Sequence, residues 1–356
     1  MRNRVKTVNI TISLTRKIMG QVTNIIEKIW NYMHLRIDTP LTVPLVGSPR
    51  SGTTWVMEII ETLGNYRVIF EPFHIGIYPI SRKFIWRFLN DPVYRITYRP
   101  YLPRYHEDKN LEKYLSMVLK GRISGYWFSP PTRLVKNLRW IKAEKVLIKD
   151  VWIPRLLPWI TYRFRHEIKR SFLLIRHPCA VIESQIRTCI GNPLCRYSKH
   201  IVKKVILKQL DAIEELKDVA DDVRSKLMNV DKSEELLAAI WSMDYFVPLY
   251  YNTRNLYIVI AYEDLVLHPN RAIKTLIQLL ELSNSGNSDK LSKFIVSPAP
   301  TAKDVANIVL DNVYKWRKRL SKQQIESILR ITHAFNLTFY DKNIEPDYNT
   351  LKNWKL

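Results

Sequence analysis

A short segment near residue 50 constrains the fold more than any other part of the chain. The sequence TVPLVGSPRSGTTWVMEII runs from an apolar stretch through Gly47, Pro49 and Gly52 into an amphipathic stretch. This order predicts a buried strand, a tight loop and a helix, with backbone N–H groups of the loop directed at the space before the helix. A phosphate or sulfate group is the ligand that such a loop favours. The chain is therefore expected to bind an anion at this turn.

The loop differs at one position from the phosphate loop of nucleoside triphosphatases. From Gly47 to Thr54 it has the spacing GxxxxGK[ST], but Thr53 stands where a lysine would reach the β- and γ-phosphates. Asp150, the candidate for a second magnesium-binding residue, follows Lys149 in a different context from the usual apolar strand. A nucleotide kinase or NTPase is therefore the minor alternative.

From residue 41 onward, short apolar runs alternate with helical patterns, as in α/β proteins. The apolar runs are rich in branched residues, which is typical of parallel strands buried on both faces. We therefore predict a P-loop NTPase-like fold of three layers, with a central, mostly parallel sheet flanked by helices. Strands are predicted over 42–47, 66–70, 145–149, 171–176 and 256–262, and helices near 53–63, 178–189, 200–217, 233–250, 269–281 and 321–334.

The residues PRSGTTW resemble the 5′-phosphosulfate-binding motif of sulfotransferases that use 3′-phosphoadenosine 5′-phosphosulfate (PAPS) as donor. The resemblance implies that Arg50 contacts the 5′-phosphate and the bridging oxygen. It also implies that four loop residues cradle the phosphosulfate and that an indole stacks near adenine: Ser51, Gly52, Thr53, Thr54 and Trp55. A core position at the start of the helix is the alternative for Trp55.

A second segment, SFLLIRHPCAVIESQIR, combines a strand, a basic residue at its carboxyl end and a helix opened by Pro178. Ligands of open α/β sheets bind at that end of the strands. The segment resembles the family's 3′-phosphate-binding motif, in which a serine follows an arginine by eight positions, here Arg176 and Ser184. Together the two motifs imply PAPS rather than ATP. The carbohydrate-type branch has aspartate where this chain has His177, so the residue that orients Arg176 is in question.

Sulfuryl transfer needs cations around the leaving group and a base at the attacking hydroxyl. Arg50 and Lys149 fit the first need, and Lys149 lies in IKDVWIPRLLP, which resembles a family segment whose lysine meets the transferred group. Val151 stands where cytosolic members carry a catalytic histidine. Glu71, in VIFEPFH, matches a Glu-Pro pair of carbohydrate-type relatives and is our candidate base, with His74 as the second candidate. The alternatives are a salt bridge to a cofactor-binding arginine for Glu71 and a packed imidazole for His74.

Charge indicates the kind of partner rather than the fold. Lys and Arg number 56 against 33 Asp and Glu, a formal net charge of +23, so an anionic partner is expected. A non-enzymatic protein that binds anionic polymers is an alternative that rests on charge alone, and no RNA-reading signature predicts specific nucleic-acid binding. The resemblance to sulfotransferases implies a small-molecule or carbohydrate acceptor, with a hydroxyl or amine as nucleophile, and no requirement for a metal.

One large domain is predicted over residues 41–345, preceded by a basic helical segment over 1–40 and followed by a tail over 346–356. An aromatic insertion at about 72–144 is expected to lie over the sheet edge and to cover the acceptor pocket. The sequence has neither an 18-residue apolar window nor the apolar stretch of a secretory signal, so a cytoplasmic protein is expected. Packing as a leading helix is expected for 1–40, with peripheral membrane contact as the alternative.

The three cysteines do not predict a disulfide framework, because their number is odd and their spacing fits no zinc site. Three reduced thiols are expected. A bridge between Cys189 and Cys195 is the alternative.

Overall fold

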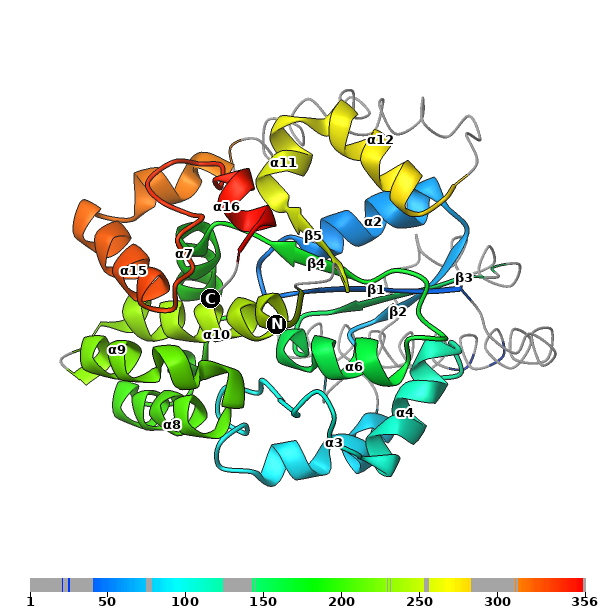
Figure 1. Cartoon of the computed structure of the whole chain (residues 1–356), viewed down its shortest axis with the longest axis horizontal. Helices are drawn as coiled ribbons and strands as arrows, with labels where there is room; N and C mark the ends of the chain where they lie inside the picture. Colours follow the sequence, from blue (N-terminus) through cyan, green and yellow to red (C-terminus); the bar gives the residue numbers. More distant parts are fainter. Residues whose placement is uncertain are drawn as a thin grey trace, which may run out of the picture.

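A five-stranded sheet forms the centre of the molecule (Figure 1). The computed structural model describes residues 41–74, 79–123, 145–228, 232–252, 256–282 and 313–354, with positions 21, 25, 143, 230 and 311. The strand order is β2-β3-β1-β4-β5, and every neighbouring pair is parallel. The strands are β1 (Leu41–Gly47), β2 (Tyr66–Phe70), β3 (Lys145–Asp150), β4 (Phe172–Ile175) and β5 (Ile258–Ala261).

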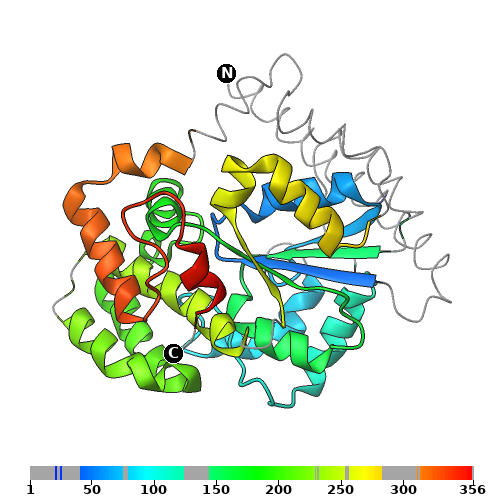
Figure 2. The same ribbon diagram turned by 45° about the horizontal axis from the view of Figure 1, so that its top comes forward.

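Helices cover both faces of this sheet (Figures 1 and 2). One face carries α2 (Thr53–Leu63), α11 (Tyr262–Leu267) and α12 (Pro269–Leu279). The other carries α4 (Lys109–Leu119) and α6 (Leu157–Arg163). The predicted α/β architecture of three layers around a parallel sheet is confirmed.

A second group of helices gathers at the carboxyl ends of the strands (Figure 1). At its centre is α10 (Ser233–Tyr251), which contacts its neighbours on several sides and is buried over almost its whole length. Burial on every side explains why its sequence is apolar around the whole helix rather than along one stripe. The surrounding helices are α7 (Pro178–Thr188), α8 (Lys199–Ala212), α9 (Lys217–Met228) and α15 (Lys322–Ala334).

The predicted elements agree with the structure to within a few residues, with two exceptions. The predicted helix 200–217 is wrong at its end, because Ile213 adopts an extended conformation and is buried, so α8 ends there and α9 begins separately. The predicted strand 256–262 is too long, because Tyr262 begins α11. The 3₁₀ turns η2 (Pro154–Leu156), η3 (Pro193–Cys195) and η4 (Glu214–Leu216) were not predicted, nor were α3 (Pro79–Asn90), α4, α6, α11 and α16 (Tyr348–Lys352).

The expectation of three reduced thiols is wrong. Cys189 and Cys195 form a disulfide, with their Cα atoms 5.9 Å apart. Cys189 ends α7 in the left-handed conformation (φ 58°), and Gly191 (φ 76°) then turns the chain back, which brings the second cysteine within reach. Cys179 is free and buried in the core.

Large parts of two predictions fall outside the described residues. Of segment 1–40, only position 21 and Ile25 lie within the described residues. Of the aromatic insertion, residues 75–78, 124–142 and 144 lie outside them. The described part of the insertion includes α3 and α4, and α4 packs against β3. Within the predicted tail, α16 buries Leu351. None of the helices in the described residues is both long and apolar enough to cross a membrane.

Candidate functional site

Every sequence-predicted site residue lies at the carboxyl end of β2 or β3 or on the loops and helices that directly follow β1, β2 and β4. Val46 of β1 is level with Asp150, the last residue of β3, and Gly47 is level with Leu174 of β4, so these three strands end within two residues of one another. Loops that leave one edge of a parallel sheet can place their side chains around one ligand. The structure therefore brings the separate motifs of the sequence to a common edge.

The loop of residues 48–52, here called the phosphate loop after its predicted ligand, follows β1 and is shaped by two residues with positive φ. Arg50 (φ 74°) and Gly52 (φ 95°) adopt left-handed conformations, and the N–H of Ser51 donates to the carbonyl of Ser48 at 3.1 Å. Gly47 has no room for a side chain, since a Cβ there would lie 2.6 Å from the carbonyl oxygen of Leu174. Alternation of left-handed and other conformations is the backbone geometry that forms anion-binding concavities.

Behind this loop lies a buried charge cluster that sequence reasoning missed. Asp244 of α10 accepts hydrogen bonds from the hydroxyl of Ser48 at 3.1 Å, from Nε of Arg99 at 3.0 Å and from Nε of Arg155 at 2.9 Å. All three charged side chains are fully buried. The N–H of Ser48 donates to the hydroxyl of Tyr245. A buried charge needs such partners, so the cluster ties the loop firmly to α10. The segment AAIWSMDY carried the signal, an acid inside an otherwise apolar helix.

The two predicted anion motifs touch each other directly. Nε of Arg50 donates to the hydroxyl of Ser184 at 2.9 Å, and Nη1 of Arg176 donates to the carbonyl of Arg50 at 3.1 Å. These contacts join residues more than 120 positions apart in the chain. Burial, and next the positive charge of Arg176, lower the pKa of Arg50. Two arginines held this close favour binding of an anion between or beside them.

Arg176 is oriented without the aspartate that carbohydrate-type sulfotransferases place after it. The carbonyl of Arg50 and the ring of Tyr262 hold it, the guanidinium lying 4.3 Å from the ring centroid. His177 instead caps α7, since its Nδ1 accepts from the N–H of Cys179, and its ring stacks on Trp316 at 4.3 Å. Burial lowers the pKa of His177 to about 4, so it stays neutral as a structural residue.

The remaining loop residues have different surroundings. Ser51 and Thr53 are buried, Gly52 is half-buried and Thr54 is exposed. Trp55 is half-buried, and its ring packs edge-on against Tyr262 at 5.6 Å. This contact fits the packing alternative for Trp55, and adenine stacking stays a prediction.

On the other side of β1, Glu71 and Lys149 form an ion pair. Glu71 directly follows β2 in a left-handed conformation (φ 48°), and its N–H donates to the carbonyl of Lys149 at 2.6 Å. The ammonium of Lys149 donates to Oε1 of Glu71, and the indole N–H of Trp152 donates to Oε2 at 3.2 Å. Lys149 is only 2% exposed, and burial lowers its pKa while Glu71 opposes that effect. Glu71 thus has the salt bridge foreseen for it as an alternative, but to a lysine rather than an arginine.

Asp150, which sequence analysis did not predict as part of this site, supports the turns around the pair. Its two carboxylate oxygens accept from the N–H groups of Phe73, at 2.9 Å, and Trp152, at 2.7 Å. It thereby fixes the turns after β2 and β3 that carry Glu71 and Trp152. Burial, and next the charge of Glu71, raise the pKa of Asp150 to about 7.

His74, the second candidate base, lies beside the same indole. The centroid of its imidazole ring is 5.6 Å from that of Trp152. The backbone N–H of His74 donates to the backbone carbonyl of Glu71 at 2.9 Å. Burial lowers the pKa of the imidazole, so His74 is neutral at pH 7. The two candidate bases are therefore neighbours. In the part of the chain that the structure describes, no cluster of three or more His, Cys, Asp or Glu side chains is arranged to hold a metal ion.

No protein-family model matches this chain, and no curated protein does. One similar solved structure is the sulfotransferase domain from the curacin biosynthetic pathway, with 14% identity, 70% of this chain and 76% of that chain covered, and a TM-score of 0.35. Another is the sulfotransferase domain of the Synechococcus PCC 7002 olefin synthase, with 17% identity, 86% and 97% covered, and a TM-score of 0.35.

Proposed function

We propose that this chain is a sulfotransferase that moves a sulfuryl group from PAPS to an acceptor hydroxyl or amine. The observation that carries the proposal is the contact of Arg50 with Ser184. It joins a loop suited to a 5′-phosphosulfate to a strand end suited to a 3′-phosphate, and Arg176 lies at the same place. A nucleotide with phosphates at both ends of its ribose matches such a pair of sites better than a triphosphate does.

Arg50, Arg176 and Ser184 supply the donor groups that two phosphates need. A guanidinium offers a planar fork of N–H donors to a phosphate. The serine hydroxyl accepts from Arg50 with one lone pair and can still donate its hydrogen to a phosphate. Thr53 cannot act as the lysine of a triphosphate site. When PAPS is bound, it supplies a sulfuryl group on a good leaving group, and the chemistry left to the chain is positioning and charge stabilisation.

Glu71 and Lys149 are proposed to act on the reacting groups. Glu71 accepts the proton of the acceptor hydroxyl through its carboxylate, beside which the ammonium of Lys149 lies. Taking up that proton neutralises Glu71. The ammonium of Lys149 then faces the oxygens of the transferred group with its charge uncompensated. Trp152 holds the second carboxylate oxygen in place.

The acceptor is proposed to be a small molecule or a carbohydrate. The half-buried ring of Trp152 beside Glu71 supports a ring-shaped acceptor, because sugars and phenols both pack against indoles. We propose no specific nucleic-acid partner and no metal.

The test compares the binding of 3′,5′-ADP, ADP and ATP to the full chain by calorimetry, once in excess EDTA and once in excess magnesium. The 3′-phosphate contacts should each contribute about 1.5–3 kcal/mol, so 3′,5′-ADP should bind at least 10-fold more tightly than ADP. An acceptor screen with labelled PAPS, also in EDTA, follows. ATP binding that requires magnesium, without a preference for 3′,5′-ADP, would establish the kinase alternative instead. Indifference among all three nucleotides and acidic polymers would favour the non-enzymatic alternative.

A further inference from the structure

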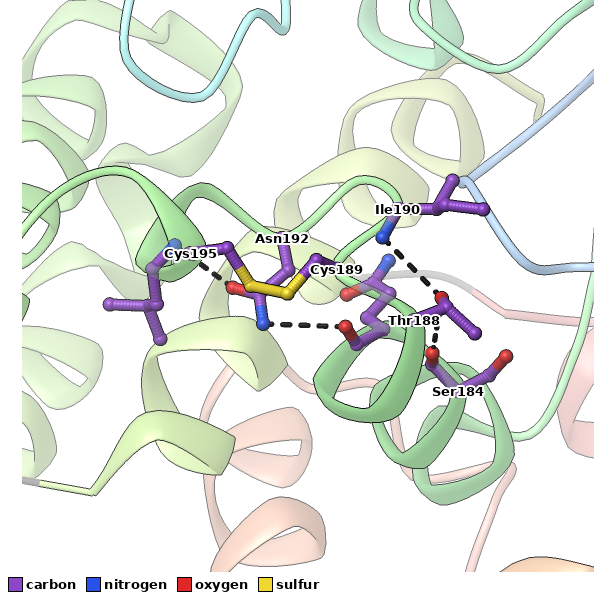
Figure 3. Close-up of a disulfide and its surroundings, with 8 residues drawn as sticks. Ser184, Thr188, Cys189, Ile190, Asn192 and Cys195 are labelled. Atoms are coloured by element: carbon purple, nitrogen blue, oxygen red, sulfur yellow. Dashed lines mark hydrogen bonds between the residues drawn. A yellow bond between two sulfur atoms is a disulfide. The ribbon is translucent and has the colours of Figure 1, made fainter. Parts of the chain in front are cut away.

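The Cys189–Cys195 disulfide lies beside the predicted 3′-phosphate site (Figure 3). Cys189 directly follows the last turn of α7, the helix that carries Ser184. The hydroxyl of Thr188 donates to the carbonyl of Ser184 at 2.6 Å and accepts from the N–H of Ile190 at 3.4 Å. Hydrogen bonds thus run from the turn that the disulfide closes to the residue that holds Arg50.

The same turn also packs against the phosphate loop. A Cβ on Gly191 would lie only 2.5 Å from Cβ of Pro49, so the backbone of the turn touches that proline. Nε2 of Gln185 donates to the carbonyl of Pro49 at 3.1 Å, and Nδ2 of Asn192 donates to the carbonyl of Gln185 at 3.4 Å. The turn therefore supports the loop on which Arg50 lies.

The conformation of this turn depends on the disulfide. Cys189 holds a left-handed φ of 58°, which is unfavourable for a residue with a side chain, and ordering the residues of the turn costs backbone entropy. The covalent bond keeps these residues in place. Both of its cysteines are exposed, whereas Cys179 is buried, so a reductant in solution reaches this bond without entering the core.

We propose that the Cys189–Cys195 disulfide is a redox-sensitive clamp on the phosphate loop. The oxidised chain holds the turn against Pro49. A dithiol reduces the bond in two thiol–disulfide exchanges, each displacing one cysteine sulfur, so that two cysteine thiols and one oxidised dithiol result. The freed turn leaves Pro49, and the phosphate loop binds its anion more weakly. Only the identity of that anion rests on the proposed function.

The test measures the affinity of the full chain for 3′,5′-ADP by calorimetry before and after reduction with dithiothreitol. Reduction should weaken binding roughly 5- to 10-fold. The double variant Cys189→Ser with Cys195→Ser should show the weak affinity whether or not dithiothreitol is present. Equal affinities of the oxidised and reduced chain would overturn the proposal.

Hydrogen exchange provides a readout that does not depend on the nucleotide. Reduction should increase amide exchange in residues 47–52 and 189–195, and unchanged exchange in 47–52 would refute the clamp even if no nucleotide bound. If 3′,5′-ADP binds neither form while exchange responds to reduction, the proposed function fails and the clamp stands. The variant Gly191→Ala should reproduce the reduced behaviour in the oxidised chain. Gly121→Ala, which also replaces a glycine of positive φ (64°), is the matched control and should leave binding unchanged.

Discussion

The two sides of β1 handle charge in opposite ways. On the β4 side, two arginines approach each other, and Arg176 helps to lower the pKa of Arg50. On the β3 side, Lys149 is paired with Glu71 inside the protein. A bound anion stabilises two like positive charges that are held close together more than it stabilises a positive charge that is already paired with a negative one. The comparison suggests that the β4 side binds the donor and that the β3 side carries out the chemistry.

The largest expected effect is on the β3 side, where Glu71→Gln keeps the size of the side chain and removes proton acceptance. General base catalysis contributes about 10²- to 10⁴-fold in rate, so kcat should fall by that factor. The affinity for 3′,5′-ADP should change little. Steady-state kinetics and calorimetry on the same sample separate the two effects.

The matched variant is His74→Gln, which changes the neighbouring candidate base. If kcat falls strongly in the His74 variant and stays near normal in the Glu71 variant, His74 rather than Glu71 is the general base. Loss of nucleotide binding in both would make the two residues structural supports and would remove the division between the two sides.

On the β4 side, Arg176→Ala should weaken the binding of 3′,5′-ADP by about 1.5–3 kcal/mol, which is roughly 10- to 150-fold. The affinity for ADP should change much less, because ADP has no 3′-phosphate. Arg170→Ala removes a half-exposed arginine two residues before the start of β4, at the end away from Arg176, and is the control for net charge. Equal losses in the two variants would mean that only overall charge attracts the nucleotide.

The smallest effect concerns Asp150, whose pKa is raised to about 7 by burial. The folded state therefore binds a proton more tightly than the unfolded state, so this residue's contribution to stability is greatest below pH 4 and is lost as the pH rises from about 4 to 7. Asp150→Asn removes that dependence and leaves one of two backbone N–H groups unpaired, at a cost of about 1–3 kcal/mol. Urea unfolding at pH 5 to 8 measures the free energy of unfolding of both proteins. The variant should be less stable than the unmodified chain by the largest amount at pH 5, and the difference should shrink toward pH 8. A constant difference would contradict the assignment.

Much of the fold could be predicted from local patterns. The strand, loop and helix around Gly52 were predicted within a residue, because an apolar run, a glycine turn and a helical period each act over a few neighbours. The same locality explains the errors at Ile213 and Tyr262. Whether a helix continues there depends on the core that the next residues enter, and periodicity alone does not report it.

The sequence by itself determined which residue types stand at the strand ends: Arg50, Lys149, Arg176 and Glu71 were all identified from their motifs. The tertiary structure alone decided their partners. That Lys149 pairs with Glu71, that Ser184 meets Arg50 and that Asp244 anchors the phosphate loop are contacts between residues at least 78 positions apart. The disulfide was likewise decided by the turn that the backbone takes after α7. Motifs report the chemistry that a chain carries, but ion pairs and hydrogen bonds form only where folding brings distant atoms within about 3 Å of each other.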